Sequence, residues 1–102
     1  MTDEINESEI NTIPGRIKVI DLTLKLVNDA YTKGKTKDAI SALRVAIEAL
    51  DSLDDRLVKQ TRKHRKIVVN ASNFQERLNE VKERFKNMVD FINAAGGPDK
   101  FL

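Results

Sequence analysis

Apolar residues recur at helical spacing in three stretches of the chain. Steps of three and four residues place such positions on one face of an α-helix. The first stretch, from about residue 15 to 32, carries Ile17, Ile20, Leu24, Val27 and Tyr31. The last stretch, from about residue 74 to 94, carries Phe74, Leu78, Val81, Phe85, Met88 and Ile92. Both patterns predict amphipathic helices.

Turn and cap residues mark the ends of these two helices. Thr12 can cap the first helix, and Pro14 fits its first turn because the missing N–H has no helical partner there. Gly34 can adopt the left-handed conformation that ends a helix. Gly96, Gly97 and Pro98 stop the last one. We therefore expect a short link after the first helix and an antiparallel hairpin with the next.

The central stretch, residues 36–70, predicts a longer helix. Its apolar face, or seam, runs through Ile40, Leu43, Ile47, Leu50, Leu53 and Leu57, turns polar at Thr61 and His64, and ends at Val68. No Gly or Pro interrupts it, which favours one continuous helix of about 33 residues, or some 50 Å. Ser52 and Asp55 resemble a capping box, so a break near Asp54 remains the alternative.

The predicted fold is an all-α antiparallel three-helix bundle with a long central helix, or four helices if that helix breaks near Asp54. We expect an acidic tail at residues 1–12, a bundle domain at 13–95 and a C-terminal tail at 96–102. Two shorter helices would leave part of the long one uncovered. This mismatch predicts a homo-oligomer, with a dimer favoured.

Composition narrows the function classes. The 102 residues include 18 Lys and Arg, 16 Asp and Glu, and no cysteine, so disulfides and thiolate chemistry are excluded. No apolar run approaches the roughly 18 residues of a membrane span. We expect no membrane partner and a cytoplasmic location.

A basic run is the most unusual local feature. On a helix, Lys59, Arg62, Lys63 and Lys66 would share one face, since they lie three or four residues apart. Such a stripe can follow phosphates. The candidate nucleic-acid-binding residues are Lys59, Arg62, Lys63, Arg65 and Lys66. The alternatives are an acidic protein partner, a solvated face, or pairing with Glu76, Glu80 and Glu83.

Two pairs of apolar residues are candidates for protein binding. Leu22 and Leu26 widen the apolar stripe of the first helix beyond what one neighbour covers. Phe101 and Leu102 follow a Gly-Gly-Pro tether and can enter a pocket on a partner. The alternative for this tail is that it frays or folds back on the bundle.

The arrangement of ionisable residues in the sequence does not support a catalytic site. His64 is the lone histidine and is flanked by cations in sequence, so we expect a packing or surface role. Asp54 and Asp55 are adjacent and would point about 100° apart on a helix. We predict no catalytic residue, metal site or cofactor. The expected function is a non-enzymatic interaction protein (an adaptor, regulator or inhibitor) with a protein partner. A nucleic-acid-binding accessory protein is the alternative.

Overall fold

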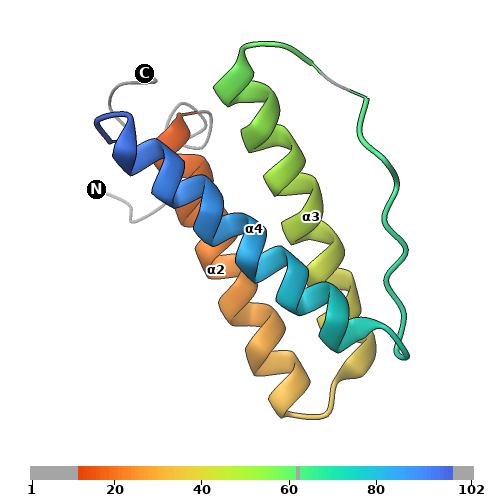
Figure 1. Ribbon diagram of the computed structural model, residues 1–102. Helices are drawn as coiled ribbons and strands as arrows, with labels where there is room; N and C mark the ends of the chain where they lie inside the picture. Colours follow the sequence, from red (N-terminus) through yellow and green to blue (C-terminus); the bar gives the residue numbers. More distant parts are fainter. Residues whose placement is uncertain (1–11, 62, 98–102) are drawn as a thin grey trace, which may run out of the picture.

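The computed structural model describes residues 12–61 and 63–97, which form three α-helices and no strand (Figure 1). Helix α2 spans Ile13–Thr32, α3 spans Thr36–Val58 and α4 spans Phe74–Ala94. The predicted all-α three-helix bundle is confirmed. Within the described residues, no helix combines the length and the apolar character needed to cross a bilayer.

Helices α2 and α3 form the predicted antiparallel hairpin. At the start of α2, the Thr12 hydroxyl accepts a hydrogen bond from the Gly15 N–H at 3.1 Å, as expected for a capping residue. At the turn, Gly34 has φ 77°, a conformation that costs glycine little because it lacks a Cβ. At the start of α3, Lys35 stands at the N-cap and makes no side-chain hydrogen bond.

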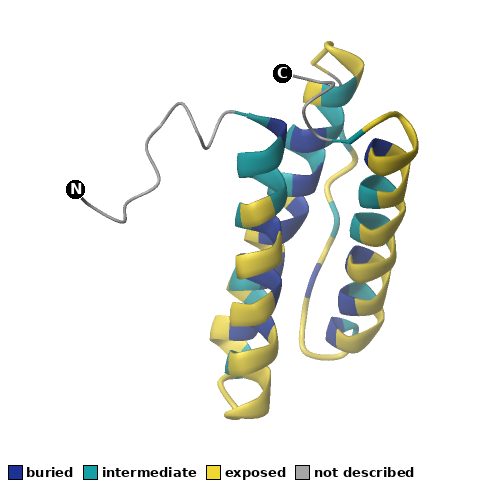
Figure 2. Cartoon of the chain, turned by 90° about the vertical axis from the view of Figure 1, so that its left-hand side faces the viewer, coloured by how far each residue is buried: buried dark blue, intermediate teal, exposed yellow. Residues whose placement is uncertain are grey.

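The core lies between the facing sides of the three helices, as the burial colours of Figure 2 show. Most of the predicted seam positions are buried, and Ile17, Ile40, Phe85 and Met88 pack against them half-buried. Tyr31 is 47% exposed, but its ring stacks on Phe74 with centroids 4.8 Å apart. This contact joins the end of α2 to the start of α4. The buried hydrophobic residues of the core are Ile13, Ile20, Leu24, Val27, Ala39, Leu43, Ala46, Ile47, Leu50, Leu53, Val69, Phe74, Leu78, Val81 and Ile92.

The predicted extension of the central helix to residue 70 is wrong. Helix α3 runs without a break through Asp54 and ends at Val58, so the four-helix alternative is wrong as well. A helix continued past Leu57 would have placed the polar residues Thr61 and His64 on the seam before the next apolar one, Val68, so its added turns would have had little to bury. Like charges three and four residues apart also oppose it. The β-branched run Ile67–Val69 favours extended backbone instead.

The connection, residues 59–73, returns the chain along the outside of α3 (Figure 1). Helix α4 therefore starts at the end of the bundle where α3 also starts, and the two run in the same general direction. The three helices have 20, 23 and 21 residues, so no long helix is left uncovered. The length mismatch that led us to expect a homo-oligomer is absent.

Candidate functional site

The connection carries the basic residues, and it is not a helix. Lys59 has φ 55°, the left-handed region, and the Gln60 N–H donates to the Asp55 carbonyl at 3.0 Å, which closes α3. The prediction that Lys59, Lys63 and Lys66 share a helix face with Arg62 is therefore wrong. Arg62 itself lies outside the described residues.

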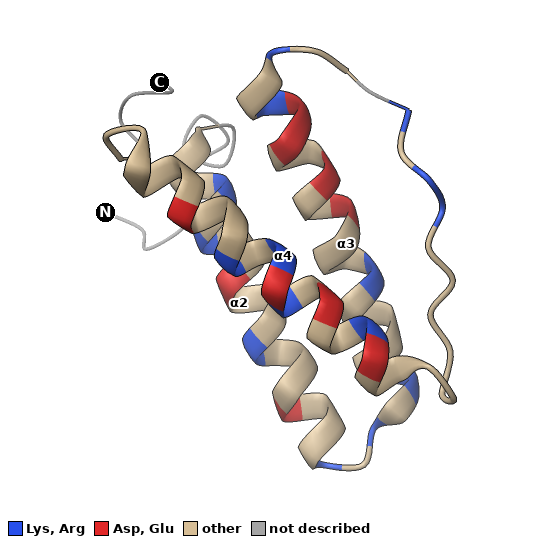
Figure 3. Cartoon of the chain, viewed as in Figure 1, with Lys and Arg blue, Asp and Glu red and all other residues tan. Residues whose placement is uncertain are grey.

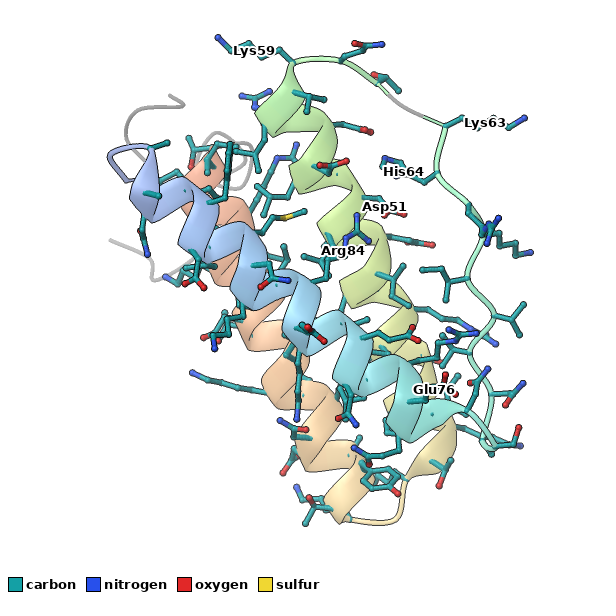
Figure 4. The ribbon with its side chains drawn as sticks, in the orientation of Figure 1. Asp51, Lys59, Lys63, His64, Glu76 and Arg84 are labelled. Atoms are coloured by element: carbon teal, nitrogen blue, oxygen red, sulfur yellow. The ribbon has the colours of Figure 1, made fainter. Side chains whose placement is uncertain are left out.

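Exposed cations are nevertheless gathered along this segment. Lys59, Lys63, Arg65 and Lys66 are all exposed, and none of them forms an ion pair with another residue of 12–61 or 63–97. Lys59 and Lys63 project away from the helices, and Glu76 lies near the other end of the connection (Figure 4). The alternative of pairing with α4 is not realised, since Glu80 pairs with Arg77 at 2.9 Å on its own helix.

His64 fastens the connection to α3. Its Nε2 lies 2.8 Å from Asp55 Oδ1 and its Nδ1 lies 3.5 Å from Asp51 Oδ1. Asp51 also accepts Arg84 Nη1 at 2.9 Å, so the same carboxylate ties α4 to the cluster (Figure 4). The cations next to His64 in sequence gave no hint of this, because its neighbours in space are carboxylates. Figure 3 shows acidic residues along α3, and lysine and arginine residues along the neighbouring connection.

Two further contacts hold the lower part of the connection. Val69 is fully buried, and its carbonyl accepts a hydrogen bond from Arg44 Nη2 at 2.9 Å. The Val68 carbonyl accepts from Arg77 Nε at 3.2 Å. A crevice of about 480 Å³ lies between this segment and α3. Its lining mixes cations with Glu48 and Asp51, so it has no single charge preference.

One group of neighbouring side chains consists of residue types that can bind a metal ion. Ligand atoms of Asp54, Asp55 and His64 lie within 4.8 Å of one another. Sequence reasoning passed over this group because His64 is distant in the chain. The close approach of His64 to Asp55 is accounted for by their hydrogen bond, so the geometry needs no metal to explain it.

An open apolar cleft lies between the C-terminal halves of α3 and α4, where the two helices diverge (Figure 1). Its volume is about 640 Å³. The floor includes Val58, which is 38% exposed, and Phe91, which is 59% exposed. Large apolar side chains this exposed, clustered in one hollow, are typical of interaction sites. The residues that line the cleft are Asp54, Leu57, Val58, Glu80, Glu83, Arg84, Asn87, Met88 and Phe91.

The polar lining of the cleft is acidic. Asp54, Glu80 and Glu83 contribute three carboxylates. The one cation of the lining, Arg84, is engaged with Asp51. Glu83 is exposed, and it forms no ion pair with any residue that the structure describes. Since Glu80 is paired with Arg77, the hollow combines apolar side chains with one exposed carboxylate, Glu83, that has no ion-pair partner in the described residues.

The predicted protein-binding residues fall in different places. Leu22 and Leu26 are 45% and 63% exposed on α2. Neither lines the cleft. Phe101 and Leu102 lie outside the described residues. Sequence reasoning missed the cleft, although its floor residues were visible as apolar positions at the edges of two seams.

Comparison of the chain with protein-family models, with curated proteins and with solved structures gave no match. The site is therefore judged from the geometry and the charges of its own residues. On these grounds the α3–α4 cleft is the strongest candidate, because it joins a concave shape, exposed apolar side chains and the exposed carboxylate of Glu83.

Proposed function

We propose that the chain is a non-enzymatic interaction protein that receives a helix of a protein partner in the α3–α4 cleft. The helix carries an apolar stripe flanked by lysine or arginine. The observation that supports this most strongly is the cleft itself, an open apolar hollow with three carboxylates in its lining. Helix-in-groove binding uses apolar anchors at steps of three, four and seven residues.

The apolar floor supplies the attraction. Burying a whole Val or Phe side chain contributes about 1.5 to 3 kcal/mol. Val58 and Phe91 are 38% and 59% exposed, so their exposed surface together is roughly that of one whole side chain. Covering them contributes roughly 2 kcal/mol, before the contacts of the partner's own apolar residues are added. This is enough to favour docking and small enough for a reversible complex.

The charge of the cleft supplies selectivity. Glu83 offers an exposed carboxylate beside the apolar side chains of the cleft, whereas Glu80 is paired with Arg77. Lysine or arginine at the flank of an incoming helix would meet the Glu83 carboxylate, whereas acidic flanks would be repelled. Such complementarity mainly sets the association rate and the choice of partner.

Two synthetic helical peptides of about 18 residues, or five turns, test the proposal. Both carry leucines at i, i+3 and i+7, and they differ only in having lysine or glutamate flanks. Fluorescence anisotropy against the full chain should show binding of the lysine peptide, at least about tenfold tighter than the glutamate peptide, which corresponds to 1.4 kcal/mol.

A charged floor provides the matching variant. Val58→Lys places a cation in the cleft at the C-terminal end of α3, where it suits the helix dipole and should leave the fold intact. This variant should bind the lysine peptide about tenfold or more weakly than the unaltered chain does. Val45→Lys is the control, since Val45 is 51% exposed on α3 and outside the cleft. Equal affinities for the two peptides, no binding, or no effect of Val58→Lys would each refute the proposal.

Nucleic-acid binding through the connection is the second candidate. It is supported by Lys63, Arg65 and Lys66, which are exposed and form no ion pair with the residues that the structure describes. Alanine at these three positions should lower the salt slope of binding to labelled DNA or RNA by about one per lost phosphate contact. Lack of binding at low salt by the unaltered chain would exclude this candidate.

A further inference from the structure

We propose that the helix received by the cleft is α2 of a second copy of this chain, which presents an apolar ridge made of Val19, Leu22 and Leu26. This inference rests on the proposed function of the cleft and names its partner. Contact between the ridge of one copy and the cleft of the next joins the chains head to tail.

The ridge has the spacing that a groove-bound helix requires. Its residues stand at i, i+3 and i+7, which places them on one face. Leu22 and Leu26 each lie two positions from a buried core residue of α2, Leu24, and so point about 160° away from it. Leu22 is 45% exposed and Leu26 is 63% exposed. The core of the same chain therefore leaves Leu22 and Leu26 available, whereas Val19, at the N-terminal end of the ridge, is half-buried.

The flank of the ridge carries the cations Lys18 and Lys25, beside two exposed acids, Asp21 and Asp29, that are paired with Lys25 and Lys33. Lys18 is exposed one turn before Leu22, and it forms no ion pair with a residue of 12–61 or 63–97. Lys25 lies 3.2 Å from Asp21, but this is a surface pair with side chains 71% and 52% exposed. Such a pair contributes little, so Lys25 can turn to a carboxylate of the cleft. The cleft presents Glu83 to these cations.

The ridge is also already folded. Helix α2 has 20 residues, is capped by Thr12 and packs along α3 in the described chain. A helix held in this way loses less conformational entropy on docking than a free peptide. This favours a second copy over an unfolded segment with the same residues.

The two surfaces are different, which fixes the geometry of assembly. The ridge belongs to α2, and the cleft is lined by α3 and α4 alone. Each contact therefore leaves one ridge and one cleft open. Such heterologous contacts continue into open chains, or close into a ring if the rotation permits.

Sedimentation velocity of the full chain, over a concentration series up to about 1 mM, tests the inference. The unaltered chain should gain mass with concentration. Leu26→Glu places a charge on the ridge and Val58→Lys places a charge in the cleft. Each variant alone should therefore stay monomeric, because one of its two contact surfaces no longer binds. Their equimolar mixture should restore one ridge–cleft contact and stop at a 1:1 pair. Val45→Glu and Val45→Lys, matched in exposure and charge, should associate as the unaltered chain does.

Leu22→Glu serves as a second ridge variant, and circular dichroism melting confirms that each variant is folded. A monomeric unaltered chain, association that ignores both variants, or a mixture that forms no pair would each overturn the inference. The lysine-flanked peptide separates this failure from that of the proposed function. If the chain stays monomeric yet binds that peptide at the cleft, self-association is wrong and the cleft function stands. If it does neither, both are wrong.

Discussion

The end of α3 at Lys59 gives the sharpest prediction about the fold. Lys59 has φ 55°, and the left-handed region costs a residue with a Cβ roughly 1 to 2 kcal/mol. Lys59→Gly removes that cost. Glycine also gives the unfolded chain more freedom, which offsets roughly 0.5 to 1 kcal/mol. We therefore expect a net stabilisation of about 0.5 to 1 kcal/mol.

The sign of the effect is decisive. If α3 continued as a helix through this position, glycine would destabilise it by about 1 kcal/mol. Urea unfolding followed by circular dichroism measures the difference, and the expected gain raises the midpoint by about 0.5 M at an m-value of about 1.5 kcal/mol/M. Lys59→Ala is the control, because alanine keeps the Cβ and should change stability little. A lower midpoint for Lys59→Gly would show that the helix does not end at Val58.

Two further variants test how the connection is held. Val69→Ala removes two methyl groups from a fully buried site and should cost about 2 kcal/mol, whereas Val68→Ala, at a position 60% exposed, should cost almost nothing in the same urea experiment. His64→Ala removes the 2.8 Å contact with Asp55 and should cost about 1 kcal/mol, with faster hydrogen exchange in residues 63–67 and unchanged exchange near Ile92. Equal costs for the two valines, or unchanged exchange in His64→Ala, would contradict the described path of the connection.

The sequence predicted the two helices whose seams and ends are both marked. Helix α2 begins after a capping threonine and ends near Gly34, and Gly96 marks the end of α4. Regular apolar spacing and local turn residues act over a few positions, so they can be recognised without tertiary information.

The end of α3 was not predictable in the same way. No Gly or Pro stands between residues 36 and 70 to mark it, and a lysine occupies the left-handed position. The helix stops where the chain turns back along α3, which lets Val69 enter the core and His64 reach Asp55. These contacts are tertiary, since they depend on where the other helices lie.

The candidate site depends on the same tertiary information. Val58 and Phe91 were recognisable as apolar residues beside the seams, but their exposure follows from the divergence of α3 and α4. The contact between His64 and Asp55 forms because the connection returns along α3. A pattern based on helical periodicity cannot place residues that meet across an extended segment.

A nuclear magnetic resonance titration tests the central claim, the binding of a helix in the α3–α4 cleft, most directly. The lysine-flanked peptide is added to the isotopically labelled full chain. We expect backbone amide shifts to concentrate at residues 54–58 and 80–91, with residues 63–66 little changed. Shifts confined to residues 63–66, or no shifts at a peptide concentration of about 1 mM, would contradict the claim.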